Sequence, residues 1–412
     1  MRSQVTAMVT IDKAKEAISQ TVDIYFSKDA SGSWRLNRSR ARPVCLMGPA
    51  GIGKTEIVRQ VAEERGLAFL SYSVTHHTRQ SAIGLPRLTE RTMGGKKVSV
   101  TEYTLSEIIA EVWRVMEESG KETGILFLDE FNCASETLRP AMLQLLQSKT
   151  FGPHALPDGW MLVLAGNPGE YNSSAVALDP VMADRMRLLW LKPDYNAWRS
   201  YMADRGLHPV VLSYLNDHLS HFYVFETASE GTALVTARGW EDLSIMLKMM
   251  EEKGFAVDLT FVAQFLQSAK VSRSFYTYYQ QYSELITSGI VDDILSAKRV
   301  KAAEKEVEKM NFTRRWALTC VLQLRLERLC ADEKSTAAEQ AMNNVLAFYE
   351  KTSMEEQRQL EFLIDGITRS NTCAMYIATH DCDLYRRIGR ELFLDKETPS
   401  ARKLKKLLES EA

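Results

Sequence analysis

The stretch V-C-L-M-G-P-A-G-I-G-K-T, residues 44–55, decides the fold. Its four apolar residues, Val44–Met47, predict a buried β-strand, and Gly48–Thr55 fits the pattern G-x-x-x-x-G-K-[ST] at every fixed position. A helical pattern follows over Glu56–Arg65. Strand, glycine loop and helix in this order form a phosphate-binding loop, because the loop N–H groups and the positive end of the helix face an anion together.

The loop also supplies the side chains that such a site needs. We expect Lys54 to reach the β- and γ-phosphates of ATP, and the Thr55 hydroxyl to ligate Mg²⁺. The predicted nucleotide contacts are Gly48, Pro49, Ala50, Gly51, Ile52, Gly53, Lys54, Thr55 and Glu56.

A second apolar run, Ile125–Leu128, ends in two carboxylates, Asp129 and Glu130. Open α/β sheets bind ligands at the carboxyl ends of their strands, so we expect this pair to lie beside the phosphate loop. Asp129 is predicted to hold Mg²⁺ and Glu130 to polarise the attacking water as a general base.

A third run, Met161–Ala165, leads into Gly166-Asn167-Pro168. An amide at that strand end can orient the water or contact the γ-phosphate, which makes Asn167 a candidate catalytic residue. Short, almost wholly apolar strands separated by helix-length segments are typical of a parallel sheet that is buried on both faces. The predicted strands are Val44–Met47, Ala68–Val74, Ile125–Leu128, Met161–Ala165 and Leu188–Leu191.

The second half of the chain differs in its helix breakers. Of 11 prolines, all but Pro399 lie at or before Pro209, and glycine also thins after Gly254. A long stretch without breakers predicts helices. Four aromatic residues at helical spacing, at positions 275, 278, 279 and 282, are expected to pack in the core rather than bind a ligand.

Together the phosphate loop, the carboxylate pair and Asn167 resemble the AAA+ ATPases, and within them the MoxR-like clade. The resemblance covers roughly residues 9–250. It implies a P-loop α/β core with a parallel sheet of strand order 5-1-4-3-2, an α-helical lid and a ring that is usually hexameric. We therefore expect an ATPase core over 1–193, a lid over 194–254 and an all-helical C-terminal region over 255–412.

The resemblance also assigns roles to single residues. Asn167 matches sensor 1, and Arg185, in Asp184-Arg185-Met186, matches the arginine finger that reaches a neighbouring subunit's γ-phosphate. The family's Phe is replaced by Met186, and Arg187 is a second candidate for the finger. Arg238 matches sensor 2, although the common Pro-Arg-Ala is Ala-Arg-Gly here.

Two insertions resemble hairpins of this clade that project toward a ring's central pore. The segment 84–103 has a Gly94-Gly95 turn and resembles the helix-2 insert, and 149–159 resembles the pre-sensor 1 hairpin. The alternative is that both are solvated hairpins, and pore contact is the favoured interpretation. Arg87, Arg91, Lys96 and Lys97 in the first could form a basic stripe.

Three functions compete. The first is a ring ATPase that remodels a partner protein, for which the clade suggests a von Willebrand A domain protein. The second is a DNA-directed motor subunit; 51 basic and 53 acidic residues give a net charge of −2, which disfavours bulk nucleic-acid binding but not a local patch. The third, a small kinase or GTPase, is disfavoured because no guanine-specifying N-K-x-D follows the loop.

Composition sets the remaining expectations. Charged residues make up 25% of the chain and hydrophobic residues 45%, which is typical of a globular protein. No run approaches about 18 apolar residues, so no membrane span is predicted. Scattered cysteines without a C-x-x-C pair, and no secretory signal, predict a cytoplasmic location. The C-terminal region could be an oligomerisation collar, a partner-docking domain or a regulatory cap.

Overall fold

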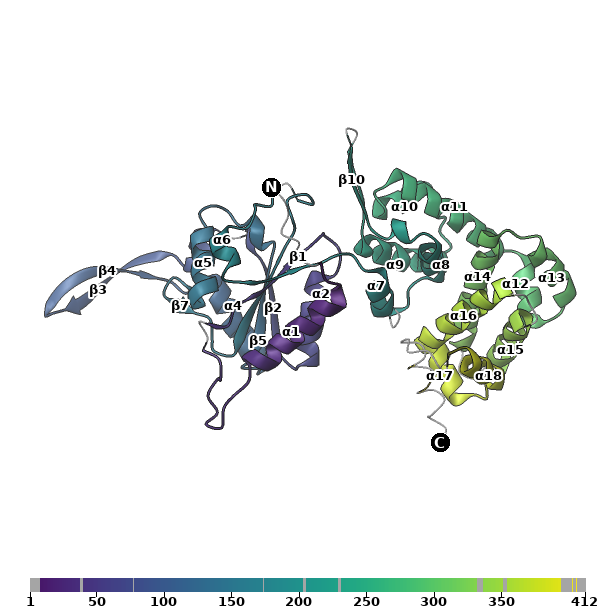
Figure 1. Cartoon of the computed structure of the whole chain (residues 1–412), viewed down its shortest axis with the longest axis horizontal. Helices are drawn as coiled ribbons and strands as arrows, with labels where there is room; N and C mark the ends of the chain where they lie inside the picture. The colour runs from purple at the N-terminus through teal and green to yellow at the C-terminus, as the bar shows by residue number, and fades with distance from the viewer. Residues whose placement is uncertain are drawn as a thin grey trace. The chain divides into compact units, whose positions relative to one another are not determined.

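The computed structural model describes residues 8–37, 40–76, 78–172, 174–202, 205–228, 231–331, 336–350, 354–393, 402 and 405. The chain divides into two compact units, Met1–Asp194 and Tyr195–Ala412 (Figure 1). Each unit has its own hydrophobic core. The further division of the second unit into a lid and a C-terminal region stays a prediction.

The first unit is built on a five-stranded parallel sheet of order β2-β5-β8-β1-β9. If the five strands are numbered in chain order and the sheet is read from β9, the order is 5-1-4-3-2. The predicted AAA+ topology is therefore confirmed. Each strand lies within about one residue of its expected ends. The strands are β1 (Val44–Met47), β2 (Ala68–Ser73), β5 (Gly124–Asp129), β8 (Trp160–Gly166) and β9 (Arg187–Trp190).

Helices cover both faces of the sheet, which is why the strands are apolar at consecutive positions. In β5, Ile125 and Phe127 pack in one core with α1 and α2, whereas Leu126 and Leu128 pack in a second core with α4 and α5. The helices of this unit are α1 (Ile11–Tyr25), α2 (Lys54–Glu64), α3 (Arg79–Ile83), α4 (Glu107–Ser119), α5 (Arg139–Ser148) and α6 (Pro180–Ala183), with short 3₁₀ turns η2 (Val74–His76) and η3 (Phe131–Cys133).

Both predicted hairpins are present. The longer one pairs β3 (Pro86–Met93) with β4 (Lys96–Tyr103) around Gly94-Gly95, and the shorter pairs β6 (Thr150–Phe151) with β7 (His154–Ala155). The β3–β4 hairpin extends away from the sheet (Figure 1), and most of its residues are exposed.

The second unit is mostly helical, as predicted, but it contains one hairpin that the sequence did not predict. Strands β10 (Val224–Ala228) and β11 (Gly231–Val235) pair antiparallel. The helical expectation for this segment rested on the absence of proline between Pro209 and Pro399 and on the lid that the resemblance implies, and it gave no weight to the β-branched Val224, Thr227, Thr232 and Val235. The helices are α7 (Tyr195–Met202), α8 (Pro209–Asp217), α9 (Ala237–Lys253), α10 (Leu259–Phe265), α11 (Ala269–Ile286), α12 (Gly289–Ser296), α13 (Val300–Glu308), α14 (Phe312–Cys330), α15 (Thr336–Glu350), α16 (Met354–Arg369), α17 (Asn371–Thr379) and α18 (Asp383–Phe393), with a 3₁₀ turn η5 (Leu219–His221).

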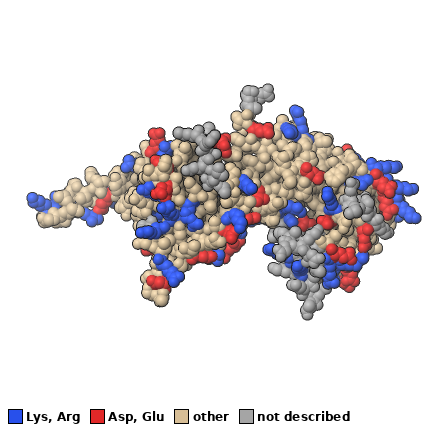
Figure 2. All heavy atoms as spheres, in the orientation of Figure 1, with Lys and Arg blue, Asp and Glu red and all other residues tan. Residues whose placement is uncertain are grey.

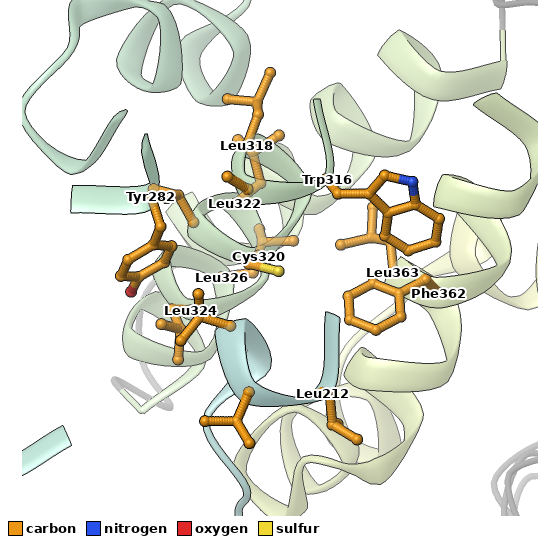
Figure 3. Packing of buried hydrophobic residues seen from close by; sticks show 14 of the residues in the cluster. Leu212, Tyr282, Trp316, Leu318, Cys320, Leu322, Leu324, Leu326, Phe362 and Leu363 are labelled. Atoms are coloured by element: carbon orange, nitrogen blue, oxygen red, sulfur yellow. The ribbon is translucent and has the colours of Figure 1, made fainter. Parts of the chain in front are cut away.

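One core runs through this unit, from Trp198 in α7 to Ile388 in α18. Figure 3 shows Trp316 and Phe362, whose rings meet edge to face, beside Leu363, with Leu212 of α8 in the same cluster. The aromatic stripe on α11 is buried in this core, which confirms its predicted packing role. Among the described helices, none is long and apolar enough to span a membrane.

Candidate nucleotide site

The phosphate loop connects β1 to α2 at the carboxyl edge of the sheet. Gly51 and Gly53 have φ angles of 71° and 95°, in the left-handed region that side-chain-bearing residues rarely adopt. Gly53 is the N-cap of α2, so the helix starts at Lys54 with its N-terminus at the loop. The loop and the helix end thus form a ready-made anion site.

Lys54 lies beneath this loop and is buried, with 8% of its surface exposed. Its ammonium donates to the carbonyl oxygens of Gly48 at 2.9 Å and Pro49 at 2.8 Å. It also donates to Oδ1 of Asn167 at 2.7 Å. A buried charge needs such acceptors, and they hold the positive charge at the loop, as binding of a β- or γ-phosphate requires.

The predicted metal ligands also come together. The Thr55 hydroxyl lies 3.4 Å from Oδ2 of Asp129, which ends β5. A hydroxyl and a carboxylate suit Mg²⁺, which binds few protein oxygens and completes its shell with water and phosphate. Within the described residues no cluster of three or more His, Cys, Asp or Glu could hold a metal. The donors present therefore fit a magnesium–nucleotide complex rather than a protein cage.

Glu130 adopts a left-handed backbone conformation, with φ of 53°. Its N–H donates to Oδ1 of Asp129 at 2.9 Å. Its carboxylate accepts hydrogen bonds at Oε2 from the hydroxyls of Ser73, at 3.1 Å, and Thr75, at 2.9 Å. A glutamate with a left-handed backbone conformation is uncommon and strained, and such backbone strain concentrates at functional sites. The turn directs the Glu130 side chain toward the end of β2.

The sequence analysis did not single out Ser73 or Thr75, although the sequence contained a pattern that points to Ser73. Ser73 is the last residue of β2 and pairs in register with Asp129. The strand-end rule that singled out Asp129 and Asn167 therefore applies to β2 as well. Cys133 lies near the same carboxylates; burial, and then the charge of Glu130, raise the pKa of its thiol and keep it protonated.

Four further residues were predicted to belong to the site. Three of them contact groups other than Lys54, Asp129, Glu130 and Asn167, and the fourth lies in the second unit. Glu56 faces its own helix, near Gln60 and Arg59. Arg185 follows α6 and donates to the Val181 carbonyl at 2.6 Å. Arg187 begins β9 and donates to the Thr21 hydroxyl of α1 at 2.7 Å. Arg238 is exposed in the first turn of α9, in the second unit. The roles of these four residues stay predictions.

Comparison with known families gives the same assignment as the geometry. Residues 43–186 match the model of the AAA domain (dynein-related subfamily). This segment is therefore similar to AAA domains. It spans the phosphate loop, the carboxylate pair and Asn167, and its sheet has the AAA+ topology.

The chain is also similar to curated proteins. A Lon protease of Fusobacterium nucleatum is 28% identical over 168 residues, 37% of this chain and 20% of that protein. ATP-dependent zinc metalloproteases FtsH of Methylibium petroleiphilum and Caulobacter vibrioides are each 41% identical over 63 residues, 15% of this chain and 10% of each relative. The matches thus span a fifth or less of these relatives.

Proposed function

We propose that the AAA domain binds Mg·ATP and hydrolyses it, and that the chain uses this turnover to remodel a partner protein. The observation that carries the proposal is the Lys54–Asn167 hydrogen bond of 2.7 Å at the loop. It joins the phosphate loop to the end of β8, while Thr55 and Asp129 meet at the end of β5. The groups that we propose to bind phosphate, bind the metal and activate water thus lie at one edge of a sheet.

Each residue has a separate task in this proposal. Lys54 and the loop N–H groups hold the phosphates, and Thr55 and Asp129 hold the magnesium ion. The ion supplies positive charge that neutralises the phosphate oxygens. Glu130 accepts a proton from the attacking water, and Ser73 and Thr75 fix its carboxylate. Asn167 orients the water or the γ-phosphate.

Replacing Lys54 tests the binding half of the proposal. Lys54→Ala removes the charge at the loop, so the affinity for a fluorescent ATP analogue should fall at least tenfold, since a charge-assisted contact is worth about 1.5–3 kcal/mol. The matched control is Lys13→Ala, which removes an exposed lysine from α1. Equal ATP affinity in Lys54→Ala and the control would contradict the proposal.

The ring and its partner form the second part of the proposal. A homo-hexamer would place Arg185 at a neighbour's nucleotide, and the contacts favour Arg185 over Arg187 as the finger. Arg187 donates to Thr21 of its own unit, whereas Arg185 contacts only the carbonyl of nearby Val181 among the hydrogen bonds of the described residues. The resemblance to MoxR-like ATPases supplies the candidate partner, a von Willebrand A domain protein.

One observation favours the alternative of a DNA-directed motor. Basic side chains gather at the end of the β3–β4 hairpin (Figure 2), where Lys96 and Lys97 are exposed. Arg91 forms an ion pair with Glu102, which locally offsets the positive charge of Arg91. A DNA gel shift at increasing salt separates the two functions: binding that Lys96→Ala/Lys97→Ala abolishes supports the motor, and no shift at low salt supports the protein partner.

A further inference from the structure

Asn132 lies in the middle of η3, two residues after Glu130, and is buried, with 8% of its surface exposed. Its side-chain amide donates from Nδ2 to the backbone oxygen of Asn167 at 2.7 Å. Asn167 in turn accepts the Lys54 hydrogen bond with its side chain. A buried amide therefore holds the peptide whose side chain contacts the phosphate-binding lysine.

Asn132 fits this place closely. A Cβ on Gly166 would stand 2.4 Å from Oδ1 of Asn132 and 3.0 Å from its Cγ, so only glycine leaves room for the amide. The same Oδ1 has no hydrogen-bond partner among the described residues. A half-satisfied buried amide stabilises a fold less well than an apolar side chain of the same size. Fold stability alone thus gives no reason for an amide here.

Asn132 also joins the loops that flank the site. Its backbone oxygen accepts a hydrogen bond from the N–H of Val176 at 3.0 Å, in the segment that follows Asn167. The turn that carries Asn132 begins at Glu130, whose left-handed backbone sets its direction. The end of β5 and the end of β8 are therefore coupled through one residue, by its backbone oxygen and its side-chain amide.

We propose that Asn132 is a positioning residue for ATP hydrolysis: its Nδ2–H fixes the Asn167 peptide and so aims the Asn167 side chain at Lys54 and the γ-phosphate. The inference rests on the proposed function. Asn132 touches neither nucleotide nor water in this role; it acts through Asn167.

A double-mutant cycle tests this dependence. Asn132→Ala should lower kcat roughly tenfold, the worth of one well-placed hydrogen bond, and leave KM within about twofold. In an Asn167→Ala background, Asn132→Ala should have little further effect on kcat, because no side chain remains to be aimed. Leu145→Ala, a core change in α5, controls for general loss of stability. Asn132→Leu fills the space without a donor and should behave as Asn132→Ala does.

The results that overturn the inference are distinct from those that overturn ATP hydrolysis. Unchanged kcat in both Asn132 variants, or multiplicative losses in the cycle, overturns the positioning role. The ¹⁵Nζ resonance of Lys54, assigned with Lys54→Arg, gives a readout that needs no turnover. It should shift in the same direction in Asn132→Ala and Asn167→Ala, and an unshifted resonance in Asn132→Ala overturns the inference. A wild-type chain without ATP turnover refutes the proposed function instead.

Discussion

Glu130→Gln removes the proposed general base with little change in shape. The amide oxygen of Gln can still accept the hydrogen bonds that Ser73 and Thr75 donate to Oε2. Gln also carries no different backbone preference that would disturb the left-handed turn at φ 53°. Lys54, Thr55 and Asp129 are untouched, so nucleotide binding should persist. The change is therefore confined to the loss of a proton acceptor.

General-base catalysis is worth about 10²–10⁴-fold, which corresponds to roughly 3–5 kcal/mol of activation free energy. We expect kcat to fall by that factor in a phosphate-release assay at saturating ATP. The affinity for a fluorescent ATP analogue should stay within about threefold of wild type, because the binding groups remain in place. Glu136→Gln, which alters a nearby exposed carboxylate, should keep full activity.

A Glu130→Gln rate above roughly a tenth of wild type, well short of that range, would refute the assignment of the base. Lost ATP binding in the same variant would refute the structural reasoning instead, since it would mean that Glu130 supports the loop. The two failures are separated by measuring binding and turnover on the same preparation.

Two further predictions concern the ring and the second unit. Arg185→Ala chains mixed with Lys54→Ala chains should regain part of the ATPase activity that each lacks, because an intact loop can then face an intact finger; mixed rings as inactive as their parts would exclude a shared site. The second concerns Glu251: burial alone would raise its pKa, but hydrogen bonds from His208 and Tyr279 and the charges of His208 and Arg328 bring it below the ordinary 4.5. Ionised Glu251 therefore stabilises the fold above the ordinary pKa of 4.5, and this stabilisation is lost as the pH falls through the lowered pKa. The difference in unfolding free energy between wild type and Glu251→Gln should shrink from pH 6 toward pH 3, and a constant difference would contradict the prediction.

Local patterns predicted the five strands and most of the candidate nucleotide site, whereas the strand order came from the family resemblance. The loop residues follow from short-range chemistry: glycines at left-handed positions and a lysine at fixed spacing from them. Asp129 and Asn167 follow from one rule, that side chains after parallel strands meet at the same sheet edge. These predictions need only the location of each strand end, which a run of apolar residues marks well.

The second unit shows where composition misleads. The scarcity of proline and glycine predicted helices correctly over α11 and α14. The same reasoning failed over Val224–Val235, where Gly231 at φ 134° begins the return strand of a hairpin. Absence of helix breakers permits a helix but does not require one, and the β-branched residues Val224, Thr227, Thr232 and Val235 favour strands here.

The residues missed at the site depend on register rather than on local pattern. Ser73 lies opposite Asp129 because β2 and β5 pair over six positions, from Ala68 beside Gly124 to the two strand ends. A shift of one residue would turn the Ser73 hydroxyl to the other face of the sheet and away from Glu130. β2 and β5 are separated in the chain by α3, the β3–β4 hairpin and α4, so nothing local specifies that register. The strand-end rule places Ser73 at this edge of the sheet, but its contact with Glu130 follows only once β2 and β5 are paired, whereas the carboxylate itself is found from the strand that precedes it.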